Sequence, residues 1–341
     1  MSSVLGIDIG QNTIKIACLS VENSKITLEA VGEDKTIKVD NKETDKDKFL
    51  NEAGKVIKGL LGDLKIKNKQ AVVSLPEDEV ISRLVRLPPL KDNEIMDALR
   101  FEAETFIPFP LEEVLIDYEI IEKDEAGRLT IFVIAARNDL INSYLKLFKS
   151  IGLDLLALES PAIALRRVLK VGIPMVERVV VVDMGEKYSD IFSINKNNVY
   201  FARSLSVGGE SLTRAISLNL SLDMASAEEY KKAYGMKEDQ LEGKIRNAIM
   251  PVFNDISEEI RKTLALFAED IGKPAELLVL TGGGANLPGM AEDLTKILGI
   301  EVQVLQPFLN IDTTKIKSGY NLNAEGCKFS LAVGLALRGL V

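Results

Sequence analysis

Two segments of the sequence place an aspartate, a glycine and a lysine in the order that a phosphate-binding hairpin requires. They are Gly6-Ile7-Asp8-Ile9-Gly10-Gln11-Asn12-Thr13-Ile14-Lys15 and Val182-Asp183-Met184-Gly185-Glu186-Lys187-Tyr188-Ser189. In each segment the aspartate would end a strand, and the glycine would stand where the backbone turns tightly. Backbone N–H groups and a lysine would then face phosphates while the aspartate orients a hydrated Mg²⁺ ion. For either segment alone, an ordinary Asp-x-Gly turn without a ligand remains the alternative.

A third glycine-containing segment, Leu280-Thr281-Gly282-Gly283-Gly284-Ala285-Asn286, follows an apolar strand predicted over 277–280. A helix is predicted to begin near Pro288. Three consecutive glycines let the backbone approach a flat or anionic ligand, which favours nucleotide contact over a flexible surface loop. The segment lacks the Gly-Lys-Ser/Thr ending of a P-loop, so the sequence disfavours a P-loop fold.

The composition excludes several kinds of chemistry. The chain has no histidine, which removes Ser-His-Asp and Cys-His catalysis, imidazole bases and most zinc or iron sites. Any chemistry must use carboxylates, lysines, hydroxyls, backbone amides and a hard metal ion. Cys18 and Cys327 lie in apolar surroundings without Cys-x-x-Cys spacing, so two buried thiols in a reducing compartment are expected.

The charge and hydropathy patterns limit the possible partners and cellular location of the protein. A net charge of −9, without a stripe of basic and aromatic residues, predicts no nucleic-acid partner. The first residues resemble a strand, not a secretion signal, and no apolar run approaches the roughly 18 residues that cross a bilayer. We therefore expect a cytoplasmic protein without direct membrane insertion, for which any membrane association must go through a protein partner.

The elements that would position these residues form a repeated plan. Strands are predicted over 3–9, 13–20 and 26–31, followed by an amphipathic helix over 49–61 and a buried strand over 71–75. Strands over 178–183, 190–195 and 199–206 repeat the beginning of this plan, and each copy has its Asp-x-Gly turn in the same place. Two similar α/β domains facing each other across a cleft are the expected result, although any two α/β units look alike at this level.

Two insertions enlarge the plan. The first contains a helix, the proline-rich loop Ile107-Pro108-Phe109-Pro110, two strands and a second helix, and the other insertion is largely helical. The predicted boundaries are 1–85 for the first domain, 86–150 for its αββα insertion, 151–177 for the return to the first domain, 178–207 for the second domain, 208–274 for its helical insertion, 275–320 for the return to the second domain, and 321–341 for a C-terminal helix that packs on the first domain.

In their order along the whole chain, the two hairpins and the glycine loop resemble the actin, Hsp70 and sugar-kinase superfamily. The resemblance implies an α/β, actin-like fold of duplicated RNase H-like βββαβα domains around a cleft that holds ATP and Mg²⁺. It assigns Mg²⁺ to Asp8 and Asp183. It assigns ATP to Gly10, Gln11, Asn12, Thr13, Lys15, Gly185, Glu186, Lys187, Gly208, Gly209, Glu228, Lys231, Gly282, Gly283, Gly284 and Ala285.

Some of these assignments have structural alternatives. Glu159, in Leu158-Glu159-Ser160-Pro161-Ala162, would position the attacking water, or it could be an acid favoured by a helix N-terminus. Ala227-Glu228-Glu229-Tyr230-Lys231 is similar to a ribose-contacting segment of bacterial actin homologues, with Gly208 and Gly209 at the adenosine-side turn. Glu228 and Lys231 could equally belong to a charged helix surface.

One stretch distinguishes among the members of this superfamily. The residues from Leu99 to Val114, Leu-Arg-Phe-Glu-Ala-Glu-Thr-Phe-Ile-Pro-Phe-Pro-Leu-Glu-Glu-Val, followed by Asp117-Tyr118, are similar to the hallmark of the PilM family of type IV pilus assembly proteins. The segment from Thr281 to Gly289 also resembles the PilM version of the adenosine loop. In contrast, the related division protein FtsA normally ends in a basic amphipathic helix, whereas this sequence ends just after a core-like helix. The hallmark could also serve as a rigid turn with two buried aromatic residues.

The family resemblance implies a scaffold of the inner-membrane pilus assembly complex that takes part in twitching motility. It implies that the N-terminal tail of PilN, a membrane-anchored partner, binds between the first domain and its insertion, in a groove whose residues the sequence does not identify. ATP would act chiefly as a ligand that stabilises one conformation, with slow hydrolysis. A kinase or vigorous ATPase, and a filament-forming protein or other homo-oligomer, are the alternatives.

Overall fold

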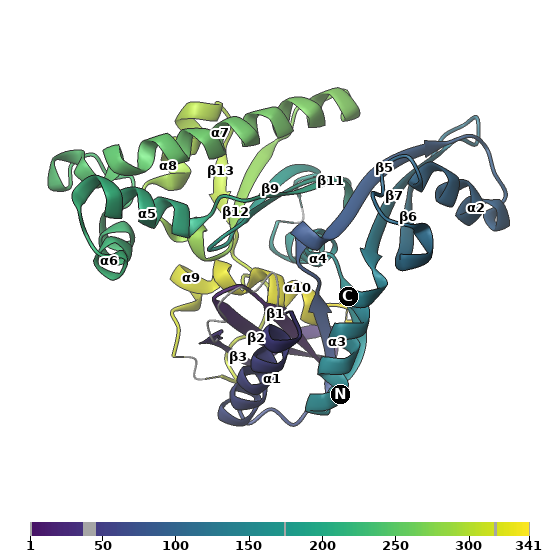
Figure 1. Cartoon of the computed structure of the whole chain (residues 1–341), viewed down its shortest axis with the longest axis horizontal. Coiled ribbons are helices and arrows are strands. Elements are labelled where there is room, and N and C mark those ends of the chain that lie inside the picture. Colours follow the sequence, from purple (N-terminus) through teal and green to yellow (C-terminus); the bar gives the residue numbers. More distant parts are fainter. Residues whose placement is uncertain (1, 37–45, 174, 317–318, 341) are drawn as a thin grey trace.

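Two five-stranded sheets with the same strand order form the two halves of the molecule (Figure 1). The computed structural model describes residues 2–36, 46–173, 175–316 and 319–340. The first sheet has the order β3-β2-β1-β4-β8, and the second has the order β11-β10-β9-β12-β13. In each sheet three antiparallel strands come first and two parallel strands follow. The predicted duplicated α/β plan is confirmed.

The bounds of the elements are as follows. The strands of the first sheet are β1 (Ser2–Ile9), β2 (Thr13–Glu22), β3 (Lys25–Lys35), β4 (Gln70–Ser74) and β8 (Asp154–Glu159), and those of the second are β9 (Arg178–Met184), β10 (Ser189–Asn195), β11 (Asn198–Leu205), β12 (Leu277–Thr281) and β13 (Val302–Val304). The longer helices are α1 (Lys46–Asp63), α2 (Asp92–Ala103), α3 (Asn138–Ile151), α4 (Pro161–Gly172), α5 (Gly209–Leu220), α6 (Met224–Tyr234), α7 (Lys244–Ile271) and α8 (Met290–Leu298). Two short helices, α9 (Leu322–Glu325) and α10 (Ser330–Ala336), follow near the C-terminus.

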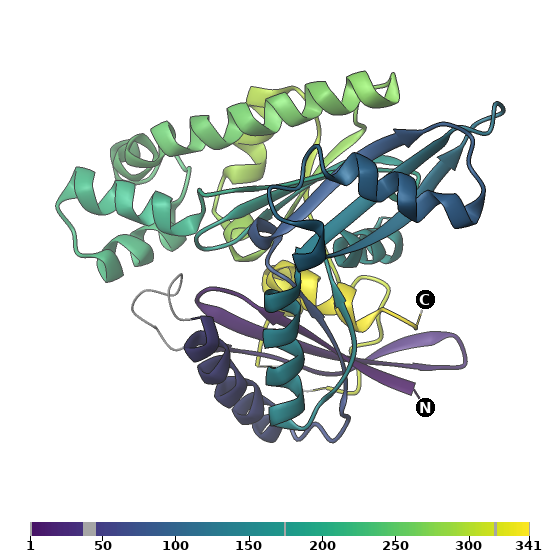
Figure 2. The same cartoon turned by 45° about the vertical axis from the view of Figure 1, so that its right-hand side comes forward.

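The central strands are buried on both faces, which explains their continuous apolar sequences. Along β9, Val179 and Val181 face the core shared by the two sheets, whereas Val180 and Val182 face the core beneath α5, α7 and α8. This alternation follows from the two-residue period of a strand. In the first sheet, α1 and α3 lie side by side over one face, as Figure 2 shows. Strand positions therefore follow directly from β-branched and apolar runs.

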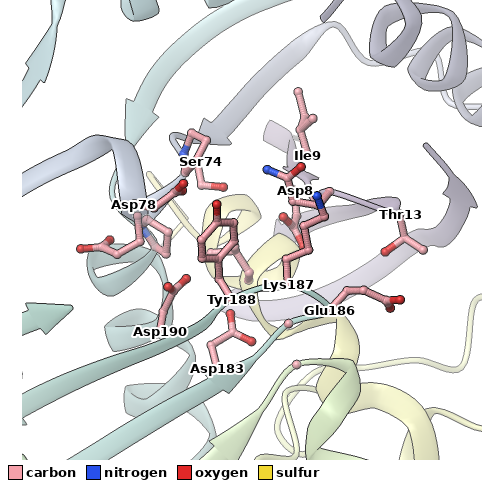
Figure 3. A pocket seen from close by; sticks show the side chains of 18 of the residues that line it. Asp8, Ile9, Thr13, Ser74, Asp78, Asp183, Glu186, Lys187, Tyr188 and Asp190 are labelled. Atoms are coloured by element: carbon pink, nitrogen blue, oxygen red, sulfur yellow. The ribbon is translucent and has the colours of Figure 1, made fainter. Parts of the chain in front are cut away.

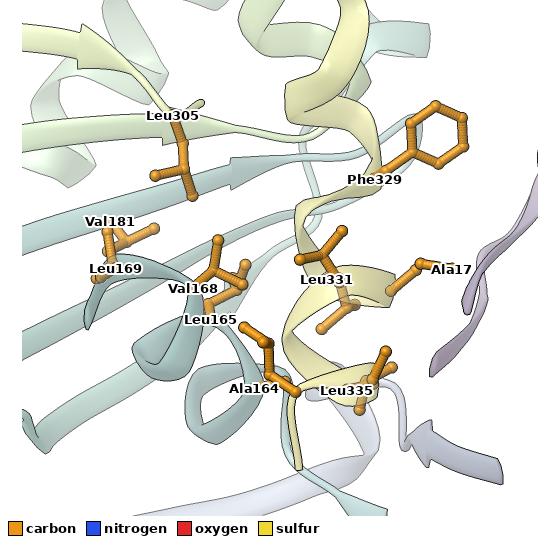
Figure 4. Close-up of a cluster of buried hydrophobic side chains, with 14 of the residues drawn as sticks. Ala17, Ala164, Leu165, Val168, Leu169, Val181, Leu305, Phe329, Leu331 and Leu335 are labelled. Carbon is orange, nitrogen blue, oxygen red and sulfur yellow. The ribbon is translucent and has the colours of Figure 1, made fainter. Parts of the chain in front are cut away.

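Helices α4 and α10 pack between the two sheets and join them. Figure 4 shows the shared apolar cluster, which includes Ala164, Leu165 and Val168 of α4, Leu331 and Leu335 of α10, Ala17 of the first sheet, and Val181 of the second. The packing is close, because a Cβ on Gly6 would lie 1.8 Å from the carbonyl oxygen of Ala332. A Cβ on Gly334 would lie 2.2 Å from the carbonyl oxygen of Ala164. Backbone contact thus fixes α10 on both sides.

The first insertion is a separate three-stranded sheet that extends from the first half of the molecule (Figure 1). Its strands are β5 (Val80–Leu87), β6 (Val114–Lys123) and β7 (Leu129–Arg137), in the order β5-β7-β6, with α2 packed on one face. The structure adds β5 to the predicted αββα plan, because this strand pairs along its whole length with β7. The predicted boundary at residue 86 falls inside β5. Helix α3 packs against α1 in the core of the first sheet.

The second insertion is helical, as expected, with α5, α6 and the long helix α7. Ile256, Ile260 and Phe267 are buried along α7. The C-terminal helix predicted within 321–341 is shorter than expected, because α10 ends at Ala336 and the chain turns at Gly339, whose φ is 74°. Of the helices described, none has the length and apolar content to span a bilayer.

Candidate nucleotide cleft and side groove

The two hairpins and the glycine loop meet at one cavity between the sheets, here called the interdomain cleft (Figure 3). The cleft has a volume of about 480 Å³, which is within the range of small-molecule sites. Predicted ligand residues that line it are Asp8, Gly10, Gln11, Asn12, Thr13, Lys15, Asp183, Gly185, Glu186, Lys187, Gly282 and Gly283. The structure thus brings together residues that lie far apart in the sequence.

The two hairpins close with the same geometry. Gly10 donates its N–H to the carbonyl oxygen of Thr13 at 3.0 Å, and Gly185 donates to that of Tyr188 at 2.9 Å. A Cβ on Gly10 would lie 2.7 Å from the Thr13 carbonyl oxygen, and a Cβ on Gly185 would lie 2.8 Å from that of Tyr188. Steric contact therefore requires glycine at both turns.

The register of the hairpins also reveals one difference between them. In the first, Asp8 lies opposite Lys15, and the Lys15 Nζ is 3.5 Å from Asp8 Oδ2. In the second, Asp183 lies opposite Asp190, another acid. The second hairpin thus has its lysine, Lys187, in the turn and not on the returning strand. Asp190 was not among the residues predicted from the sequence, although the equal spacing of the two hairpins identifies it as the counterpart of Lys15.

The acidic groups of the cleft are partly desolvated. Burial raises the pKa of Asp183 to about 7, with repulsion from Asp8 adding to the shift and Lys15 opposing it. Burial likewise raises the pKa of Asp190 to about 8. Asp190 Oδ1 is buried and has no hydrogen-bond partner among the described residues. A bound cation would stabilise the ionised form of these acids.

Mg²⁺ fits this arrangement when it is held together with phosphate. Within the described ranges, no group of three or more Asp, Glu, Cys or His side chains is placed to hold a metal ion. Mg²⁺ usually keeps several waters and takes one or two carboxylates plus the phosphates of its substrate. Asp8 and Asp183, which interact electrostatically across the cleft, could supply these carboxylates.

The glycine loop packs on the end of β9. A Cβ on Gly282, whose φ is 81°, would lie 2.3 Å from Asp183 Oδ1, and one on Gly284 would lie 2.9 Å from Met184 Cβ. Nothing lies within 4 Å of the corresponding position on Gly283. Two of the three glycines thus allow the loop to contact β9, and Gly283 leaves open space beside it.

Several predicted residues do not line the cleft: Glu159, Gly208, Gly209, Glu228, Lys231, Gly284 and Ala285. Lys231 is buried and donates to the Gly209 carbonyl oxygen at 2.9 Å and to Thr213 Oγ1 at 2.8 Å. It also pairs with Glu228 at 2.6 Å. These two charged residues therefore connect α6 to the start of α5. Gly208 packs against the second hairpin, because a Cβ there would lie 2.5 Å from the Glu186 carbonyl oxygen.

Glu159 points away from the cleft. Its side chain is only 2% exposed and forms ion pairs with Arg167 and Arg338. A different acid, Glu77, lines the cleft and accepts a hydrogen bond from Ser160 Oγ at 3.1 Å. Burial raises the pKa of Glu77 well above its usual range, and repulsion from Asp190 adds to this effect. The Glu159 carboxylate therefore does not lie at the position beside the attacking water that the sequence predicts for it.

A second cavity, here called the side groove, lies between the inserted sheet and the first half of the molecule. It has a volume of about 570 Å³. Most of its lining residues come from β6, β7, α3, β8 and α4, and Leu75, Val80, Ser160 and Arg338 complete the lining. Three leucines in it, Leu115, Leu145 and Leu156, are 57%, 48% and 49% exposed. Both β6 and β8 are edge strands of their sheets.

The duplicated sheets around a cleft define an actin-like protein. Similar solved structures include MreB5 of Spiroplasma citri bound to AMPPNP, with a TM-score of 0.55 and 12% identity over 100% of this chain and 96% of that one. EutJ, the ethanolamine utilization protein of Carboxydothermus hydrogenoformans, has a TM-score of 0.59 and 16% identity over 99% and 90%. These similarities confirm the predicted fold class.

A match over nearly the whole chain identifies the family. A family model for the type IV pilus assembly protein PilM matches residues 6–340, so the chain belongs to this family. A chain in the structure of a PilM–PilN type IV pilus biogenesis complex has a TM-score of 0.85 and 28% identity, over 99% of this chain and 98% of that one. EutJ of Escherichia coli strain K12 is 25% identical over 147 residues, which span 43% of this chain and about half, 48%, of that relative.

Proposed function

We propose that this protein is an ATP-binding scaffold of the type IV pilus inner-membrane assembly complex that binds the N-terminal cytoplasmic tail of PilN. The observation that carries the proposal is the similarity, over 99% of the chain, to a chain of a PilM–PilN complex. Through this partner the protein would be peripheral to the inner membrane and would support pilus assembly and twitching motility.

ATP would bind in the interdomain cleft. The backbone N–H groups of the two hairpins and Lys15 would face its phosphates, and Asp8 and Asp183 would hold Mg²⁺. An actin-like relative solved with AMPPNP supports this choice of ligand. The observed position of Glu159 favours ATP as a conformational ligand with slow hydrolysis, because this carboxylate is engaged by two arginines outside the cleft.

The PilN tail would bind in the side groove. An extended peptide can add to an exposed sheet edge through backbone hydrogen bonds, with alternate side chains in pockets. The groove offers the edge strands β6 and β8 together with the exposed leucines Leu115, Leu145 and Leu156. It also lies between the first sheet and the inserted sheet, where the family resemblance implies the tail.

The two sites share a wall, which would let nucleotide tune partner binding. Leu75 lines both the cleft and the groove, and its N–H donates to the Glu159 carbonyl oxygen at 2.8 Å. Ser160, in the groove lining, donates its hydroxyl to Glu77, in the cleft lining. A shift of this wall upon nucleotide binding would change both sites, which is the requirement for a coupling free energy between them.

Calorimetric titration of a PilN tail peptide from the same genome tests the proposed partner and its place. Native protein should bind one peptide, and Leu145→Arg should lose most of the affinity by placing a charge on the apolar wall. Leu218→Arg is the control, because Leu218 is 75% exposed on α5 and lies outside the groove. Absence of binding to native protein would contradict the proposed partner, and equal loss in both variants would contradict the proposed place.

A further inference from the structure

Strand β6 presents alternate side chains to the side groove. Leu115, Asp117 and Glu119 line the groove at every second position, in agreement with the two-residue period of a strand, and Tyr118 also contributes to the lining. Ile116, between them, packs into the core of the inserted sheet. One face of β6 therefore presents a leucine and then two acids to any segment lying beside it.

The acids of the groove differ in their partners. Glu119 pairs with Arg166 at 2.7 Å, and Glu159 pairs with both Arg167 and Arg338. Within the described part of the chain, the Asp117 carboxylate has one partner, the backbone N–H of Tyr118 at 2.8 Å. Asp117 is thus an acid in the groove that no described cation neutralises.

The position of Asp117 along the groove is fixed by strand pairing. Leu115 lies opposite Ala136, just before the start of α3, whose Ile141 and Leu145 also line the groove. At the other end, Glu119 reaches α4 through Arg166. Asp117 therefore lies between an apolar end and a charged end.

We propose that Asp117 selects a cationic group on the bound segment and thereby fixes the register of an extended peptide in the groove. The inference rests on the proposed function, because it concerns the tail of the same partner. A segment that covers the groove removes water from Asp117, and an unpaired carboxylate opposes this desolvation. A lysine or arginine side chain, or a terminal ammonium, compensates this desolvation by pairing with Asp117. Registers that do not bring such a cation to Asp117 are disfavoured.

The geometry also predicts the spacing of the recognised groups. Residues two apart in an extended chain are separated by about 7 Å on one face. The cation that meets Asp117 should therefore stand two residues from an apolar side chain that meets Leu115. A one-residue slip would turn both groups away, which makes the pairing a determinant of register.

Calorimetric titration of the PilN tail peptide into two variants tests this inference. Asp117→Asn keeps the oxygen that accepts from Tyr118 N–H, so the strand should fold unchanged, but it removes the charge. We expect about tenfold weaker binding, with a shallower dependence on salt. The matched control is Glu122→Gln, on the same strand but exposed outside the groove, which should change affinity less than twofold.

Changes in the peptide identify the source of the cation. Acetylation of its N-terminus removes the ammonium, and Lys or Arg replaced by Gln removes a side-chain charge. The peptide change that removes the recognised group should weaken binding to native protein about tenfold. It should leave binding to Asp117→Asn almost unchanged, as in a double-mutant cycle. Equal affinity of native and Asp117→Asn protein would overturn this inference alone, whereas failure of native protein to bind the peptide would overturn the proposed function as well.

Discussion

Asp183→Asn is expected to stabilise the nucleotide-free protein at pH 8 while weakening its binding of Mg-ATP. Burial raises the pKa of Asp183 from 3.8 to about 7, and the charge of Asp8 adds to the effect. Because the folded-state pKa lies above the unfolded value, the folded state holds this proton more tightly. Stability therefore falls as pH rises from about 4 to about 7, and the loss is complete above that range.

The magnitude follows from the two pKa values. With pKa values of 3.8 unfolded and about 7 folded, Asp183 lowers the stability of the folded state by about 2 kcal/mol at pH 5 and about 4 kcal/mol at pH 8, relative to a pH below both values. Asparagine does not ionise, so the stability advantage of the variant over native protein should grow by about 2 to 3 kcal/mol between these pH values. Urea unfolding followed by far-UV circular dichroism measures this difference.

A control and a second assay separate this explanation from a general effect of the substitution. Asp97→Asn, on the exposed face of α2, should show no such growth between pH 5 and pH 8. Calorimetry at pH 8 should show Mg-ATP binding to Asp183→Asn weakened by about tenfold or more, the loss of one charged ligand. A stability advantage that is equal at the two pH values would show that burial does not raise the pKa of Asp183.

Three further predictions concern the shared core, the wall between the sites and the role of the acids. Gly334→Ala should lower the free energy of unfolding in urea by about 2 to 4 kcal/mol, because its Cβ would lie 2.2 Å from a carbonyl oxygen of α4. Gly59→Ala, with nothing within 4 Å, should instead be neutral or stabilising by up to about 1 kcal/mol. Ser160→Ala should reduce the coupling between ATP and the PilN tail, measured by paired titrations, by about 1 kcal/mol, since it removes the hydrogen bond to Glu77. Glu77→Gln should lower the slow release of phosphate from ATP more than Glu159→Gln does, and the reverse order would return the water-positioning role to Glu159.

Local sequence features were sufficient to predict both hairpins and every strand of the two sheets except the edge strands β8 and β13. Apolar and β-branched runs such as Val179 to Val182 predict buried strands, and an Asp-x-Gly turn at the end of each first strand marks the cleft. The side-chain direction at the end of β8 could not be predicted in the same way. Glu159 and Ser160 are neighbours, yet only the packing of α4 and α10 determines that Glu159 meets Arg167 and Arg338.

Long-range pairing explains what else the sequence concealed. Strand β5 is rich in apolar residues, but its partner β7 lies more than forty residues along the chain, so nothing local assigns it to the inserted sheet. The side groove likewise combines residues of β6, α3, β8 and α4. Asp190 is the exception, because the shared spacing of the two hairpins locates it opposite Asp183.

The most direct test of the proposed scaffold function is calorimetric titration of the PilN tail peptide into native protein with and without Mg-ATP. A nucleotide-dependent scaffold should show saturable binding near one peptide per chain, with an affinity that nucleotide shifts, and the ratio of the two affinities gives the coupling free energy. No binding in either state would contradict the scaffold function and leave the actin-like fold to be examined for kinase activity and filament formation.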